Sequence, residues 1–92
     1  MTLKDAIKSV VNGFHTGDLF DTHTVINELL KNPDYHMAYL KEFSENTTVS
    51  LYHGLISRLI GTEDSVRSTE KKVKSHTIYG DISNNELWEK IN

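Results

Sequence analysis

The sequence predicts a mostly α-helical domain with a small C-terminal β-hairpin, in the arrangement of a winged helix-turn-helix. Four apolar stripes occupy the chain up to Gly61, with the spacing of about 3.6 residues that is typical of helices burying one side. After Gly61 apolar and polar residues alternate, as in strands, and turn-forming residues separate two such segments at 72–79 and 87–91. Ninety-two residues suffice for one small core, so a single domain is expected over 1–92.

The first helix is expected to begin after Thr2, whose side chain can cap it, with Asp5 near its positive end. Apolar side chains then recur with helical spacing as far as Phe14, and Gly13 and Gly17 end the helix. Residues 18–20 are too few for a helix, so a brief extended segment is predicted there.

Two further helices are predicted on either side of a proline. Asp21 or Thr22 is expected to cap the first of them. Pro33 interrupts it, since the residue before a proline is biased away from helical angles. Pro33 also suits the first turn of a new helix, whose apolar side extends to Phe43. A polar turn is expected at 44–48, with Thr47 or Thr48 capping the helix that follows.

The helix predicted at 47–61 has two sides that differ more sharply than those of any other segment. One side is apolar and is expected to pack against the core. The other side is small and hydrogen-bonding, with one fixed charge, and consists of Ser50, His53, Gly54, Ser57, Arg58 and Gly61. An ordinary solvated side would hold Glu and Lys at most of these positions, so we infer that another surface approaches it closely.

The segment at 72–79 alternates and contains β-branched residues and tyrosine, which favour a strand. The segment at 87–91 is either the second strand of a hairpin or a short helix capped by Asn84 or Asn85. We favour the strand, because a lone strand at 72–79 needs a partner for its backbone groups.

The first functional hypothesis is a small DNA-binding regulator in which residues 47–61 form the recognition helix. Recognition helices present side chains to the major groove of double-stranded DNA, and Arg58 suits a guanine or phosphate contact. A homodimer is expected, because one such helix buries little DNA surface. The candidate contact residues are Ser50, His53, Gly54, Ser57 and Arg58 on the helix, and Arg67, Lys71, Lys72 and Lys74 in the basic stretch at 67–76.

The alternative hypothesis is a protein-binding module, for example a phage or mobile-element product that occupies a host protein. A net charge of −3 opposes general polyanion binding, because contacts from Lys and Arg to phosphate drive that affinity. In this case the strip formed by Ser50, Gly54, Ser57 and Gly61 would pack against the partner.

Other classes have little support. The chain has no cysteine, which excludes disulfides and thiolate metal sites and is compatible with a reducing cytosol. No apolar run approaches the roughly 18 residues of a membrane span, and the opening residues lack a signal-peptide cleavage site, so a cytoplasmic protein is expected. No catalytic motif is recognisable, so we expect neither an enzyme nor a cofactor. The five histidines lack metal-pair spacing, so no metal is expected, and His23 beside Asp21 is interpreted as capping and orienting the second helix.

Three segments resemble a group of short bacterial and mobile-element proteins. These segments are residues 17–23 (GDLFDTH), residues 53–57 (HGLIS) and residues 74–90. The last segment contains the pair Leu87 and Trp88. The group has a GD-hydrophobic-FD-S/T-H opening, an HG-x-I-S segment and an H-G-N/D…LW ending, and the chain departs from it at Tyr79, where the group has His. The resemblance covers most of the chain and implies a compact winged-helix-like domain, without implying an activity.

Overall fold

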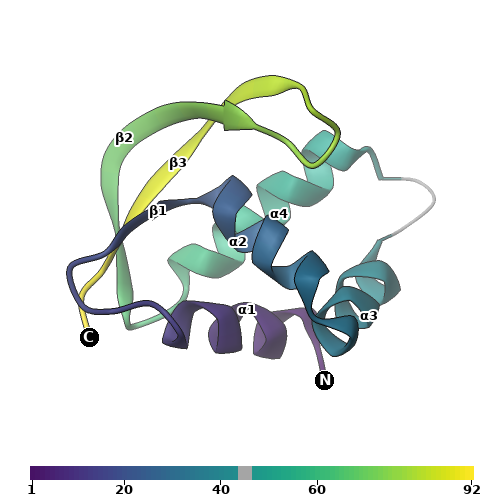
Figure 1. Cartoon of the computed structure of the whole chain (residues 1–92), viewed down its shortest axis with the longest axis horizontal. Helices are drawn as coiled ribbons and strands as arrows, with labels where there is room; N and C mark the ends of the chain where they lie inside the picture. Colours follow the sequence, from purple (N-terminus) through teal and green to yellow (C-terminus); the bar gives the residue numbers. More distant parts are fainter. Residues whose placement is uncertain (44–46) are drawn as a thin grey trace.

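The computed structural model describes residues 1–43 and 47–92, and in these ranges four helices gather on one side of a three-stranded antiparallel sheet (Figure 1). The elements are, in chain order, α1 (Leu3–Asn12), β1 (Leu19–Asp21), α2 (Thr22–Lys31), α3 (Pro33–Glu42), α4 (Val49–Gly61), β2 (Val66–His76) and β3 (Ile82–Lys90). None of these helices combines the length and the apolar character that crossing a membrane requires.

The predicted fold class is wrong, because the sheet is more than a C-terminal hairpin. Strand β3 lies in the centre of the order β1-β3-β2, and β1 from the first half of the chain pairs with it so that Phe20 lies opposite Trp88. The fold is therefore mixed α and β rather than mostly α and winged helix-turn-helix-like. Three residues at 19–21 are too few to show alternation, so the sequence pattern did not reveal that they join a sheet.

The helix starts follow the predicted caps. Thr2 and Asp5 form a reciprocal capping box at α1, and the Asp21 carboxylate accepts from the Thr24 backbone N–H at 2.8 Å at the start of α2. Helix α3 begins at Pro33, as predicted, and Thr48 caps α4. Of the polar turn expected at 44–48, residues 44–46 lie outside the described residues. Local sequence therefore determines where each helix begins.

The two long strands differ from their predicted bounds. Strand β2 begins at Val66 and ends at His76, and β3 begins at Ile82, whereas strands were predicted at 72–79 and 87–91. The register of β2 against β3 breaks between Ser68 and Lys72, and Glu70 in this bulge has a φ of 62°, in the left-handed region. The bulge interrupts the alternation and hides the first half of β2. Residues 87–90 of the segment predicted at 87–91 are strand, as we favoured, and the helical alternative for this segment is wrong.

Helix α4 packs on the core through most of its predicted apolar side. Tyr52, Ile56 and Ile60 are buried in the core, together with residues from α1, α2, α3 and the sheet. Leu51, which lies on the predicted apolar side, is 66% exposed. The apolar side predicted for the helix that begins at Pro33 includes Leu40, which is 52% exposed and therefore outside the core. Leu55 and Leu59 are partly buried against the core, and the small side of α4 faces the hairpin.

Candidate functional site

Part of the small side of α4 is covered by the chain's own sheet. The Trp88 indole Nε1–H of β3 donates to the Thr22 hydroxyl at 3.0 Å, and that hydroxyl lies 3.2 Å from Ser57 Oγ on α4. A Cβ added to Gly61 would lie 3.3 Å from the Trp88 ring, so a side chain larger than glycine would crowd the indole there. The C-terminal half of the predicted docking strip therefore packs within the protein.

His23 connects the start of α2 to both strands of the hairpin. Its ring is buried, with Nδ1 2.7 Å from Ser75 Oγ on β2 and Nε2 3.4 Å from Ser83 Oγ on β3. Its backbone N–H donates to Asn85 Oδ1 at 2.9 Å. The helix cap itself is Asp21, so the interpretation of His23 as the capping residue is wrong: its side chain fixes the hairpin to α2.

Asp21 stays ionised beneath the hairpin. Burial raises the pKa of its carboxyl group, but hydrogen bonding by Ser75, Thr24 and Asn85 outweighs burial and places the pKa below its ordinary value. The carboxylate accepts from both the backbone N–H and the hydroxyl of Thr24. A negative charge at this position also stabilises α2, because it lies at the positive end of the helix dipole.

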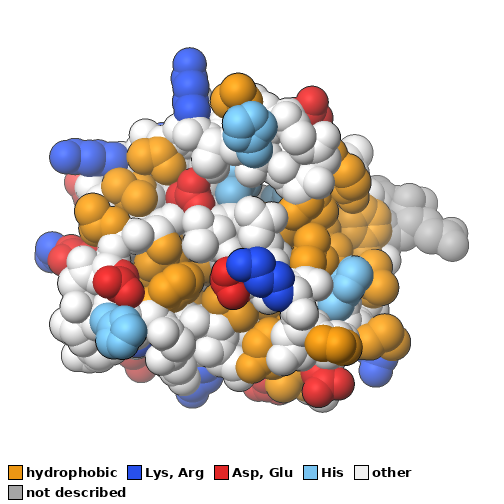
Figure 2. Space-filling view, viewed as in Figure 1, with side chains coloured by type: hydrophobic (Ala, Val, Ile, Leu, Met, Phe, Trp, Pro, Cys, Tyr) orange, Lys and Arg blue, Asp and Glu red, His pale blue; other side chains and the backbone are white. Residues whose placement is uncertain are grey.

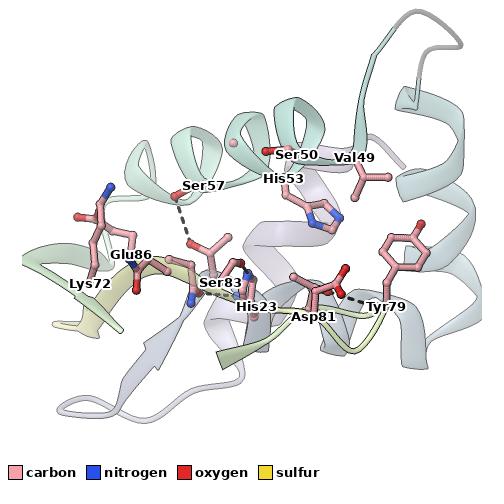
Figure 3. Close-up of a pocket in the computed structure, with 15 residues that line it drawn as sticks. His23, Val49, Ser50, His53, Ser57, Lys72, Tyr79, Asp81, Ser83 and Glu86 are labelled. Atoms are coloured by element: carbon pink, nitrogen blue, oxygen red, sulfur yellow. Dashed lines mark hydrogen bonds between the residues drawn. The ribbon is translucent and has the colours of Figure 1, made fainter. Parts of the chain in front are cut away.

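An open cleft of about 520 Å³ separates the N-terminal half of α4 from the hairpin. Figure 3 shows His53 pointing from α4 into the cleft, and Tyr79 and Asp81 reaching toward it from the hairpin tip. The lining consists of Thr22 and His23 from α2, Val49, Ser50, His53, Gly54 and Ser57 from α4, and Lys72, Thr77, Tyr79, Asp81, Ser83, Asn84, Asn85 and Glu86 from the hairpin. Most of these side chains are neutral and can form hydrogen bonds, and carbon atoms form the larger part of the exposed lining, so the cleft suits a ligand with both polar and apolar groups.

Helix α3 fixes the orientation of His53 at one end of the cleft. The Tyr39 hydroxyl lies 2.9 Å from His53 Nε2, and the Tyr39 and Tyr52 rings meet edge to face with centroids 5.0 Å apart. Burial raises the pKa of Tyr39 to about 12, so its hydroxyl is protonated at neutral pH. Burial, with a smaller contribution from His23, lowers the pKa of His53 below 6.5, so the imidazole is neutral there.

Acid is expected to destabilise the protein through His53. The pKa of His53 is 6.5 when unperturbed and lower in the folded state. Above pH 6.5 the imidazole is neutral in both the folded and the unfolded chain, so it does not reduce the free energy of unfolding there. As the pH falls through 6.5, the unfolded chain binds a proton that the folded protein resists, and the free energy of unfolding decreases. Denaturant unfolding on both sides of this pH measures the loss, and His53→Gln should reduce it. An equal loss in both proteins would contradict the assignment.

The nine predicted contact residues separate into two groups. Ser50, His53, Gly54, Ser57 and Lys72 line the cleft. The other four lie outside the lining: Arg58, Lys71 and Lys74 are exposed, and Arg67 forms an ion pair with Glu89 at 2.7 Å.

Sequence reasoning missed the opposite wall of the cleft, which is formed by residues 77–86. Turn formation already explained the polar composition of that segment, so no further pattern pointed to a site. Within residues 1–43 and 47–92, no group of three or more His, Cys, Asp or Glu side chains is placed to hold a metal ion.

The three segments that resemble the group of mobile-element proteins meet beside the cleft. Thr22 belongs to the first segment, Ser57 to the second and Trp88 to the third, and their side chains form one hydrogen-bonded chain. In comparisons with known proteins, no family model, curated protein or solved structure matches this sequence.

Proposed function

We propose that the protein is a protein-binding module whose cleft between α4 and the hairpin receives a segment of a partner protein. The observation that supports this most directly is the open space at Gly54. A Cβ added there meets no described atom within 4 Å, although glycine inside a helix costs about 1 kcal/mol relative to alanine. A partner backbone can approach α4 closely at this point, as Trp88 does at Gly61.

The rim of the cleft supports a protein partner. Tyr79 lines the cleft and is 64% exposed, and Ile82, which follows the hairpin tip, is also 64% exposed. Aromatic residues are enriched at the centres of protein interfaces, where they combine a large contact area with a polar group. A polar cleft beside exposed apolar side chains can therefore form both the hydrogen bonds and the apolar contacts of such an interface. The predicted partner class, a host protein, remains part of this proposal.

DNA remains a second candidate, because four of the predicted cations are free to contact a phosphate backbone. Arg58, Lys71, Lys72 and Lys74 are all exposed, and none forms an ion pair with a described residue. Figure 2 shows Lys and Arg side chains projecting over the hairpin, but acidic and neutral residues separate them on this face. With Asp81 and Glu86 in the cleft lining, the charge distribution favours a protein over DNA.

Gly54→Leu is expected to weaken partner binding strongly while the protein stays folded. The added side chain would occupy the cleft, and its Cβ would meet no described atom within 4 Å. A photo-cross-linking amino acid at exposed Ser50 would identify the partner in cells, and a titration of the purified partner would then measure a loss of at least about tenfold, or 1.4 kcal/mol. Thermal unfolding would show that the variant is no less stable than the native chain, since leucine is a better helix former.

Two controls make this experiment specific to the cleft. Gly54→Ala adds only a methyl group and should weaken binding of the partner less than Gly54→Leu does. A cross-linker at Leu19, which is exposed on β1 and outside the cleft lining, should not give the same adduct. Equal affinity of Gly54→Leu and the native chain would rule out the cleft. If random duplex DNA binds with a salt dependence that Lys72→Ala and Lys74→Ala each reduce, the partner is DNA.

A further inference from the structure

The fixed charges in the cleft are not evenly distributed. Lys72 and Glu86 lie opposite each other in the register of β2 and β3, so charges of both signs are present at the sheet end. Asp81 lies at the hairpin-tip end. Among the residues that the structure describes, no Lys, Arg or His is within ion-pair distance of Asp81. The tip end therefore has one unbalanced negative charge.

The groups beside Asp81 do not neutralise this charge. His53 faces it from α4 (Figure 3) and is held by the Tyr39 hydroxyl, and burial lowers the pKa of His53, so the ring is uncharged at neutral pH. The Tyr79 ring also lies at this end. The face of a tyrosine ring attracts cations, with a preference for guanidinium groups. A carboxylate and an exposed aromatic ring thus adjoin the same part of the cleft.

We propose that the hairpin-tip end of the cleft receives a basic side chain of the partner protein, with its cation between the Asp81 carboxylate and the Tyr79 ring. This inference rests on the proposed protein-binding function and specifies the chemistry of the partner. An arginine suits the site best, because its planar guanidinium can both donate to a carboxylate and stack on a ring. The chain's net charge of −3 also favours encounter with a basic surface.

The smaller lining residues are compatible with a side chain presented on a polypeptide. Ser50 and Gly54 form the α4 wall and leave room for a backbone. Ser83 and Asn84 on the opposite wall offer donors and acceptors for peptide groups.

The test is an NMR titration of the isotope-labelled full chain with three blocked tripeptides, Gly-Arg-Gly, Gly-citrulline-Gly and Gly-Glu-Gly. Citrulline has nearly the shape of arginine without its charge. The difference in affinity between the arginine and citrulline peptides therefore measures the effect of the positive charge alone. The arginine peptide should shift the amide resonances of residues 53–54 and 79–81, with an affinity about fivefold higher than that of the citrulline peptide, as expected for a partly exposed ion pair. The glutamate peptide should bind most weakly.

Variants assign the effect to the proposed groups. Asp81→Asn should reduce the affinity for the arginine peptide to that for the citrulline peptide, and Tyr79→Leu should weaken both. Asp64→Asn removes an exposed acid outside the cleft lining and should change neither affinity. Amide spectra of the free variants report whether each is folded.

Two results would overturn the inference. If the arginine and citrulline peptides bind the cleft equally, or if Asp81→Asn has no effect, the basic-side-chain inference fails while the protein-binding function stands. If none of the peptides shifts the cleft resonances, the inference also fails, and the partner titration with Gly54→Leu decides the proposed function independently.

Discussion

A chain lacking residues 84–92 is expected to lose its cooperative unfolding transition altogether. The deletion removes most of β3, which is the central strand of the sheet, and leaves the backbone groups of β1 and β2 without partners. It also removes Trp88, which is buried in the core, and Lys90, whose buried ammonium donates to the Phe14 carbonyl. Circular dichroism during heating would show no sharp transition.

A shorter truncation serves as the control for this experiment. Ile91 and Asn92 are exposed and follow the last residue of β3, so a chain without them should melt close to the full chain. If the chain lacking 84–92 also melted near the full chain, β3 would contribute little to stability, and the sheet would not depend on its central strand.

Ile56→Ala should reduce the free energy of unfolding by about 2–5 kcal/mol, because it removes buried methyl groups and leaves a cavity. Ile56 is fully buried in the middle of α4, where the helix packs against the rest of the core. A loss of this size is a large part of the stability of a small domain, which is about 5–15 kcal/mol. Chemical denaturation of both proteins measures the difference.

Leu51→Ala is the matched control, since it removes an aliphatic side chain of similar size from the same helix. Leu51 is 66% exposed, so the substitution should change the free energy of unfolding by no more than about 0.5 kcal/mol. A larger loss for Leu51→Ala than for Ile56→Ala would mean that α4 packs on the core through Leu51 rather than through Ile56.

Helix starts could be predicted from the sequence because their causes are local. The capping box of Thr2 and Asp5, and Pro33 at the first turn of α3, act within one helical turn. The sheet could not be predicted in full, because β1 pairs with a strand near the other end of the chain. Its three residues are fixed by the pairing of Phe20 with Trp88 rather than by their own pattern.

The candidate site was predicted on one side only. The absence of Glu and Lys around Ser50, His53 and Gly54 is a property of a single helix, so it is visible in the sequence, and these residues line the cleft. Which other surface approaches that helix depends on tertiary packing. At Ser57 and Gly61 the surface is the chain's own α2 and β3.

The irregularity in β2 has a consequence for self-association. Strand β2 is a long outer strand of the sheet, and among the described residues β3 is the one strand hydrogen-bonded beside it. A regular outer strand can recruit a strand from another molecule. Here the outward backbone is broken at Glu70, where φ is 62°, and Lys71, Lys72 and Lys74 are exposed just beyond the break. Two copies brought together along β2 would place these lysines close to one another and would not align over the full strand. We therefore expect the sheet to remain three-stranded even at high protein concentration, and any homodimer to form through another surface.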